Sequence, residues 1–147
     1  MADKIEELPV FPKAQSFCMA VHAILQRAEV LADRDLQRQI SEANDSITAN
    51  MREGFEQKTD ALFANYLHYS KGSIAEVLDR LESAHRKGLV TDKELATLLE
   101  TGDEVCRMLG GFIKYLEHSN FKHRGSHASR RHPRRPPRPP VRSRRSG

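Results

Sequence analysis

One residue pair in the sequence has the type and spacing of a metal site. Glu82 and His85 form a Glu-x-x-His pair, and carboxylate-bridged bundle proteins hold two metals with two such pairs and two further inward glutamates. The chain has one copy of this pair, and Arg86 and Lys87 follow it directly. A solvated helix end, where the helix dipole favours a histidine, accounts for the pair more simply. We therefore predict no metal site and no cofactor.

Residue types used in nucleophilic catalysis are present without a recognisable arrangement. Cys18 and Cys106 both fall on apolar helical stripes, where a free cysteine packs as a small hydrophobic residue. They could face each other across a bundle, but they do not suggest the disulfide framework of a secreted protein. Cys18 has no convincing partner base, and no Ser/His/Asp arrangement is evident. We predict that the protein is not an enzyme.

The distribution of charge is the strongest functional signal. Residues 1–117 hold 14 Lys or Arg and 20 Asp or Glu, whereas residues 118–147 hold 10 Lys or Arg and no acid. Arginine presents a fixed fork of donors that matches phosphate, and binding through several such contacts weakens steeply with salt. In this segment only Phe121 could stack on a base, so we expect little sequence-specific readout. The predicted nucleic-acid-binding residues are Arg130, Arg131, Arg134, Arg135, Arg138, Arg142, Arg144 and Arg145.

The proline content of the same segment leaves alternative roles open. Pro136, Pro137, Pro139 and Pro140 prevent a helix, so we expect residues 119–147 to form a disordered tail that samples extended conformations. A proline-rich tail can be a ligand for another protein. It can also be a solubilising tail without a partner, or a low-complexity extension encoded by GC-rich DNA.

The residues before this tail form four amphipathic segments. Apolar residues recur with a mean spacing of about 3.5 residues over 12–32, 35–53, 60–87 and 92–118. Short connections between such helices predict an all-α fold, an antiparallel up-down-up-down four-helix bundle over residues 1–118. The expected core residues are Phe17, Val21, Ile24, Ala28 and Leu31, then Leu36, Ile40, Ala43, Ile47 and Met51, then Phe63, Leu67, Ser70, Ile74, Val77, Leu81 and Ala84, and then Leu95, Leu98, Gly102, Val105, Leu109, Phe112 and Leu116.

Capping residues predict where these helices begin and end. Thr91 and Glu94 have the spacing of a capping box before the fourth helix. Gly54 and Gly88 are expected to stop the second and third helices, because glycine adopts the left-handed conformation at little cost. Candidate caps for the second and third helices are Asp33 or Asp35, and Thr59 or Asp60.

A short motif, Asn50-x-x-Glu53-Gly54-Phe55, ends the second helix. Asn50 lies near the seam and is expected to fix the register through a buried hydrogen bond. Glu53 is expected to form a pair with a residue of a neighbouring helix, and Phe55 is expected to pack over the end of the bundle core. This structural interpretation is preferred to the alternative, a ligand-binding or catalytic role for Asn50 and Glu53.

Glycines inside helices form a second signal. Gly72-Ser73 lies in the middle of the third helix, where glycine costs about 1 kcal/mol relative to alanine. A close approach of helices, within the protomer or between protomers, would compensate. Gly102, Gly110 and Gly111 could allow the same in the fourth helix. We prefer packing to phosphate binding, because no strand precedes these glycines.

Further features concern assembly and location. The third and fourth helices carry more apolar residues than one seam needs, which predicts self-association. The N-terminus does not resemble a signal peptide, and no apolar run approaches the roughly 20 residues that span a bilayer. We expect a cytoplasmic protein without a membrane partner. The surplus apolar residues are Phe55, Leu62, Tyr69, Leu99, Cys106 and Ile113.

Residues 8–117 resemble the four-helix-bundle proteins encoded by intervening sequences of bacterial large-subunit rRNA. That family includes relatives of the accessory variability protein of diversity-generating retroelements. Met51 and Leu62 depart from the common pattern, as do Ser70 and Lys71 before Gly-Ser. The resemblance is carried by Ile47, Asn50, Glu53, Gly54, Phe55, Phe63, Gly72, Ser73 and Glu76.

The resemblance implies a homopentamer around a central channel and no enzymatic activity. In the retroelement relatives, it implies binding of RNA or DNA and of a reverse transcriptase. The acidic body of this chain departs from a basic bundle surface. We therefore predict a non-enzymatic, oligomeric accessory protein that binds RNA or DNA electrostatically, with a reverse transcriptase as a candidate partner. The alternative is a protein-interaction scaffold whose bundle binds a partner protein and whose tail is incidental.

Overall fold

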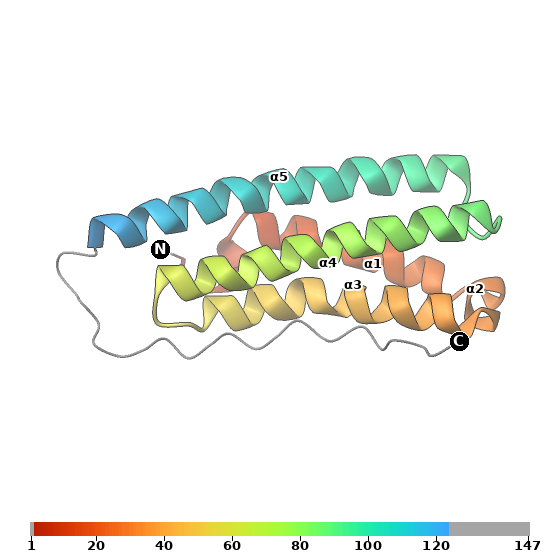
Figure 1. The fold of residues 1–147 in the computed structure, drawn as a ribbon, viewed down its shortest axis with the longest axis horizontal. Coiled ribbons are helices and arrows are strands. Elements are labelled where there is room, and N and C mark those ends of the chain that lie inside the picture. The colour runs from red at the N-terminus through yellow and green to blue at the C-terminus, as the bar shows by residue number, and fades with distance from the viewer. Residues whose placement is uncertain (1, 124–147) are drawn as a thin grey trace.

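The computed structural model describes residues 2–123 of the chain, with side chains through Ser119. Four long helices form an antiparallel bundle in which each packs against two neighbours (Figure 1). This arrangement confirms the predicted all-α, up-down-up-down four-helix bundle. The elements are the 3-10 helix η1 (Ile5–Glu7), α1 (Val10–Leu25), α2 (Ala28–Ala32), α3 (Arg34–Phe55), α4 (Asp60–Arg86) and α5 (Asp92–His123).

The continuous first helix predicted over 12–32 is wrong, because α1 ends at Leu25 and the chain bends before α2. Arg27 has an extended backbone at the bend, with φ −66° and ψ 141°. Its guanidinium donates to the Glu94 carboxylate and to the carbonyl oxygen of Leu89, the latter at 3.4 Å. The bend is therefore held by a contact with a segment more than sixty residues away in the sequence.

The predicted seam forms the core in the other helices. Every expected seam residue of α3 and α4 is buried, and in α5 only Leu95 and Phe112 are half-buried instead. On α2 the bend changes the inward residue: Val30 is 1% exposed, whereas Leu31 is 45% exposed and Ala28 is also exposed. Of the helices that the structure describes, none has the length and apolar character needed to cross a membrane.

The helix ends follow several of the predicted capping residues. Thr91 Oγ1 accepts from the Glu94 N–H at 3.1 Å, and Glu94 Oε1 accepts from the Thr91 N–H at 3.0 Å, as in a capping box. Gly88 ends α4 with a φ of +77°, and its N–H donates to the carbonyl oxygen of His85 at 2.9 Å. Two further predicted caps accept backbone N–H groups at the starts of α3 and α4, namely Asp33 and Thr59.

The last helix is longer than predicted. We expected it to end at His118, but α5 continues to His123. The sequence has no proline or glycine between His118 and Gly125 that would end the helix. In Figure 1 the blue end of α5 reaches past the start of α4, near the connection between α3 and α4. The predicted disorder of the tail from residue 124 onward lies outside the described residues.

Candidate functional site

A polar seam joins α3 to α4 inside the bundle. The hydroxyls of Ser46 on α3 and Ser73 on α4 lie 2.6 Å apart, and both residues are buried. Asn50 donates from its side-chain amide to the carbonyl oxygen of Ser46 at 2.8 Å and to its Oγ at 3.0 Å. Ser70 donates to the carbonyl oxygen of Ile47 at 2.8 Å. Asn50 is therefore half-buried and bonds within α3, and the buried hydrogen bond predicted for it is instead made between the helices by Ser46 and Ser73.

Gly54 is not the left-handed stop that the sequence predicts. Helix α3 continues through it to Phe55, and the one glycine with positive φ in the described part of the chain is Gly88. A Cβ on Gly54 would lie 2.7 Å from Tyr66 Cβ and 2.9 Å from Phe63 Cδ1. A glycine is therefore needed here because α3 and α4 approach each other closely.

Four aromatic rings form a chain from this helix pair to the surface of α5. Phe55 and Phe63 meet edge to face with centroids 6.0 Å apart, and Phe63 and Phe112 do so at 5.4 Å. Phe112 and Tyr115 are nearly parallel, with an interplanar angle of 10° and centroids 6.1 Å apart. The chain connects the half-buried Phe55 to an exposed tyrosine that the sequence pattern did not indicate.

The other motif residues lie nearer the surface. Glu53 is exposed, and among the described residues no cation pairs with its carboxylate, contrary to expectation. Glu76 is half-buried on α4. Gly72 is exposed and has no atom within 4 Å of the position of a Cβ, so it serves no close approach within the bundle. Gly102, in contrast, does allow a close approach between helices, since its Cβ would lie 3.0 Å from Leu78 Cδ1.

The two cysteines have different neighbours. The thiol of Cys18 on α1 donates to the carbonyl oxygen of Asn44 on α3 at 3.7 Å, whereas Cys106 on α5 experiences the charge of Lys71 on α4. Burial and the charge of Asp45 raise the pKa of the Cys18 thiol to about 12, and burial also raises the pKa of Cys106. Both thiols are free and protonated at neutral pH, so neither supplies the thiolate that nucleophilic catalysis requires.

His85 of the Glu-x-x-His pair interacts with a carboxylate of the next helix. His85 Nε2 contacts the Oδ1 atom of Asp92 across the turn between α4 and α5. Within residues 2–119, no three His, Cys, Asp or Glu side chains are placed to hold a metal ion. His85 therefore links the end of α4 to the start of α5.

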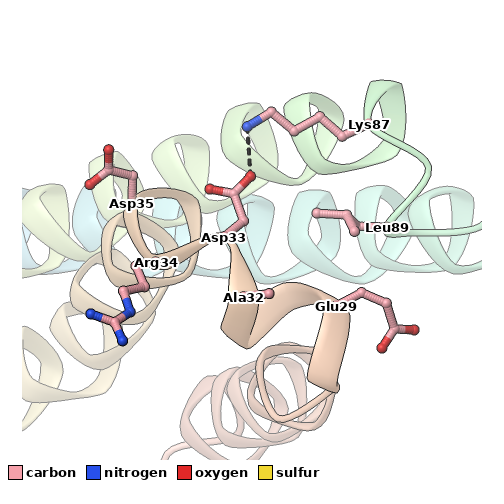
Figure 2. A pocket seen from close by; sticks show the side chains of 7 residues that line it. All are labelled: Glu29, Ala32, Asp33, Arg34, Asp35, Lys87 and Leu89. Atoms are coloured by element: carbon pink, nitrogen blue, oxygen red, sulfur yellow. Dashed lines mark hydrogen bonds and ion pairs between the residues drawn. The ribbon is translucent and has the colours of Figure 1, made fainter.

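A surface hollow of about 700 Å³ lies where α2 and α3 meet the turn after α4 (Figure 2). The Lys87 ammonium and the Asp33 carboxylate point toward one another there, with Nζ and Oδ2 2.7 Å apart. Lys87 lowers the pKa of the Asp33 carboxyl group, and the same carboxylate caps α3 through the N–H of Leu36. Because both charged groups hold this corner of the fold together, they are poorly placed to act as an acid and a base on a ligand.

Two smaller grooves lie beside α1. The groove between α1 and α5 has a volume of about 350 Å³ and includes the ion pair of Lys13 with Glu104. The groove between α1 and α3 has a volume of about 300 Å³, and His22 and Asp45 line it beside Cys18. Since the pKa of the Cys18 thiol is about 12, this set does not form an activated nucleophile.

The eight arginines predicted to bind phosphate, from Arg130 to Arg145, lie outside the described residues. The described bundle has the opposite charge, with 20 Asp or Glu and 14 Lys or Arg in residues 2–119. The positive charge that can attract a polyanion is therefore concentrated in the sequence beyond the bundle.

Sequence comparison places the bundle in a family. The model of a family described as 23S rRNA-intervening sequence protein matches residues 6–111, which include both motifs. No curated protein matches the chain. The matched residues run from η1 into the second half of α5 and make up well over half of the sequence. The chain therefore belongs to the 23S rRNA-intervening sequence protein family.

Proposed function

We propose that the protein is a cytoplasmic, non-enzymatic accessory protein that binds RNA or DNA through its arginine-rich C-terminal segment. The observation that carries the proposal is the division of charge, with ten Lys or Arg and no acid in residues 118–147 after a net acidic bundle. The description of the family names an rRNA sequence, so RNA is the first ligand to test. Arginine forks match phosphate geometry and provide affinity with little sequence preference.

The use of polar groups in the bundle supports a role without catalysis. Asn50 and Ser73, two polar residues of the motifs, are both hydrogen-bonded to Ser46. The Cys18 and Cys106 thiols have raised pKa values. These motif side chains are therefore engaged in the fold, and both thiols are held in the protonated state that is inactive in nucleophilic catalysis.

The bundle would act as a platform for the basic segment. Helix α5 continues to His123 and reaches past the start of α4 (Figure 1), so the arginines follow from one end of the bundle. Like charges on the acidic bundle and on nucleic acid repel each other. That repulsion favours contact through the C-terminal segment over contact through the bundle surface.

We also propose that the protein is a homo-oligomer, with five subunits as its family resemblance suggests. Five of the six surplus apolar residues remain half-buried in the described bundle, so contact with another copy would bury more of their surface. The exposed Gly72 leaves room for close approach of a neighbouring helix. Several linked basic segments would bind one nucleic acid more tightly than one segment alone. The half-buried residues are Phe55, Leu62, Tyr69, Leu99 and Cys106.

A second candidate is a scaffold that binds a protein partner, such as a reverse transcriptase, through the bundle. The groove between α1 and α5 favours it, because Phe17, Leu98 and Val105 line that groove beside small side chains. An apolar groove between two helices can accept side chains of a partner helix. In this case the basic segment would be incidental.

The discriminating experiment uses full-length variants, so that the bundle and the chain length stay constant. The eight predicted arginines are changed together to Gln in one variant and to Lys in a matched control. Fluorescence anisotropy with a labelled single-stranded RNA measures affinity, and sedimentation velocity measures the subunit number. We expect the Gln variant to lose binding and the Lys control to keep most of it, with an unchanged oligomer in both.

The remaining outcomes separate the candidates. Equal binding by wild type and the Gln variant would assign recognition to the bundle surface. If wild type binds neither RNA nor DNA at low salt, the nucleic-acid proposal fails and the scaffold becomes the leading candidate. A monomer at micromolar concentration would contradict the proposed oligomer.

A further inference from the structure

Tyr115 on α5 is an aromatic side chain that the fold leaves open to solvent. It is 62% exposed, and within the described residues the other large hydrophobic side chains with such exposure are Met19 and Leu31. The Phe112 ring lies beside it, nearly parallel at 10° but with the centroids 6.1 Å apart, so the two rings are offset. Part of a face of the Tyr115 ring is therefore open to solvent.

The position of this open face follows from helix geometry. A helical side chain leans over the turn that precedes it, so Tyr115 lies between the residues three and four positions earlier. These residues are Phe112, which stacks on the ring, and Gly111, which is exposed. Apart from its two chain neighbours and the backbone of α5, no atom lies within 4 Å of the place where a Gly111 Cβ would be. No other element of the bundle therefore covers the surface of α5 at Gly111.

Phe112 connects Tyr115 to the core. Phe112 is packed edge to face on Phe63, and Phe63 on Phe55, with centroid distances of 5.4 and 6.0 Å. Phe63 is only 4% exposed.

One lysine and one histidine lie near this position along the helix. Lys114 and His118 are exposed, and His118 lies one turn after Tyr115 on the same side of α5. The nearest acid in sequence, Glu117, is directed to α4, where its Oε1 lies 3.3 Å from His68 Nε2. The run of residues without an acid begins directly after Glu117.

We propose that Tyr115 and the uncovered surface of α5 at Gly111 form a stacking site for an unpaired base of single-stranded RNA. The inference rests on the proposed function and adds a contact to the base, whereas the arginines contact the phosphates. Aromatic side chains beside a cationic track are the usual means of holding single strands, and stacking is tolerant of sequence. The site would give a preference for unpaired over paired nucleic acid.

A fluorescence titration tests the contact directly, because the natural chain has no tryptophan. In full-length Tyr115→Trp the indole is the sole tryptophan and reports on its own surroundings. A ten-nucleotide oligoadenylate should quench its emission. An abasic oligomer with the same number of phosphates should bind through the arginines without quenching. Equal quenching by both oligomers, or by neither, would overturn the proposal.

Affinity measurements provide a second test. Tyr115→Ala is expected to weaken binding of the oligoadenylate about fivefold or more, and Tyr115→Phe retains the ring. Gly111→Leu should weaken binding as well, because it fills the space beside the ring while favouring the helix. Met19→Ala is the control for an exposed apolar side chain elsewhere, and its affinity should equal that of wild type.

The outcomes distinguish this inference from the function on which it rests. If the Arg-to-Gln variant loses binding while Tyr115→Ala and Gly111→Leu bind normally, the arginines act alone and the stacking site is wrong. If Tyr115→Ala changes the sedimentation coefficient but not RNA affinity, the ring belongs to an interface between copies, which also overturns the inference. If wild type binds no RNA, the proposed function fails first.

Discussion

The hydroxyl groups of Ser46 and Ser73 lie 2.6 Å apart between α3 and α4. Ser46 also receives the side-chain amide of Asn50 on both its carbonyl oxygen and its Oγ. Ser46 and Ser73 are 8% and 7% exposed, so water has little access to replace these contacts. A buried polar pair of this kind fixes one register between two helices, because a slip by one turn would leave both hydroxyls without a partner.

Replacing one member of this pair should destabilise the fold. Ser46→Ala leaves the Ser73 hydroxyl without its partner and removes one acceptor of Asn50, at an expected cost of about 1–2 kcal/mol. Urea unfolding followed by circular dichroism measures the change. The double variant Ser46→Ala/Ser73→Ala should recover part of the loss, since no unpaired hydroxyl remains. Additive losses in the double variant would show that the two residues are not coupled.

The close approach of α3 and α4 at Gly54 predicts strong sensitivity to a single methyl group. Gly54→Ala would place a Cβ 2.7 Å from Tyr66 Cβ, and overpacking of this kind costs about 1–3 kcal/mol. Gly111→Ala is the matched control, because no atom of another element lies within 4 Å of its Cβ position. It should stabilise α5 by about 0.5–1 kcal/mol. Equal stability of the two variants in urea would contradict the packing at Gly54.

The Arg27–Glu94 ion pair predicts a loss of stability in acid. The hydrogen bonds from Arg27 and Thr91 lower the pKa of Glu94 from its ordinary value of 4.5 to about 2. Because the folded-state pKa is the lower one, the stabilisation is complete above pH 4.5 and is lost as the pH falls toward 2. Solvent screens part of the pair, so we expect about 1–2 kcal/mol from it.

The test compares wild type with Glu94→Gln in urea at several pH values between 2 and 7. The glutamine keeps an oxygen that can accept from Thr91 and lacks the charge. The Glu94→Gln variant should be less stable than wild type near pH 6, and the two proteins should be nearly equal in stability near pH 2. A constant difference between the two proteins across this range would show that the charge of Glu94 does not contribute.

The cysteines should be poorly reactive in the folded protein. Burial and Asp45 raise the pKa of Cys18 to about 12, and the reactive species is the thiolate. Iodoacetamide at pH 8 should therefore modify both thiols much more slowly in buffer than in 8 M urea, with mass spectrometry as the readout. Rapid modification of Cys18 in the folded protein would contradict its burial.

The sequence predicted the repetitive features of the fold well, for definite physical reasons. A 3.5-residue apolar period defines the inward side of a helix, and all expected core residues of α3 and α4 are buried. Caps are equally local, which explains why the Thr91–Glu94 box and the stop at Gly88 are confirmed.

Features that depend on distant residues were not predictable from the pattern. The bend before α2 is held by Arg27 and Glu94, and no local signal indicates it. Gly54 looks like a helix stop, but its role depends on the position of Tyr66 on α4. Among the site residues, Tyr115 was missed because its exposure and its contact with Phe112 depend on the whole bundle. The available signal was its position three residues after Phe112, because residues with this spacing are neighbours on a helix surface.

The most direct test of the proposed function is the salt dependence of RNA binding. The affinity of full-length protein for a single-stranded RNA is measured between 50 and 300 mM KCl, for wild type and for the variant with eight Arg-to-Gln changes. If the arginines neutralise several phosphates, a plot of log affinity against log salt should have a slope of about −3 or steeper for wild type and a much shallower one for the variant. Equal slopes and affinities for the two proteins would contradict electrostatic binding through the C-terminal arginines.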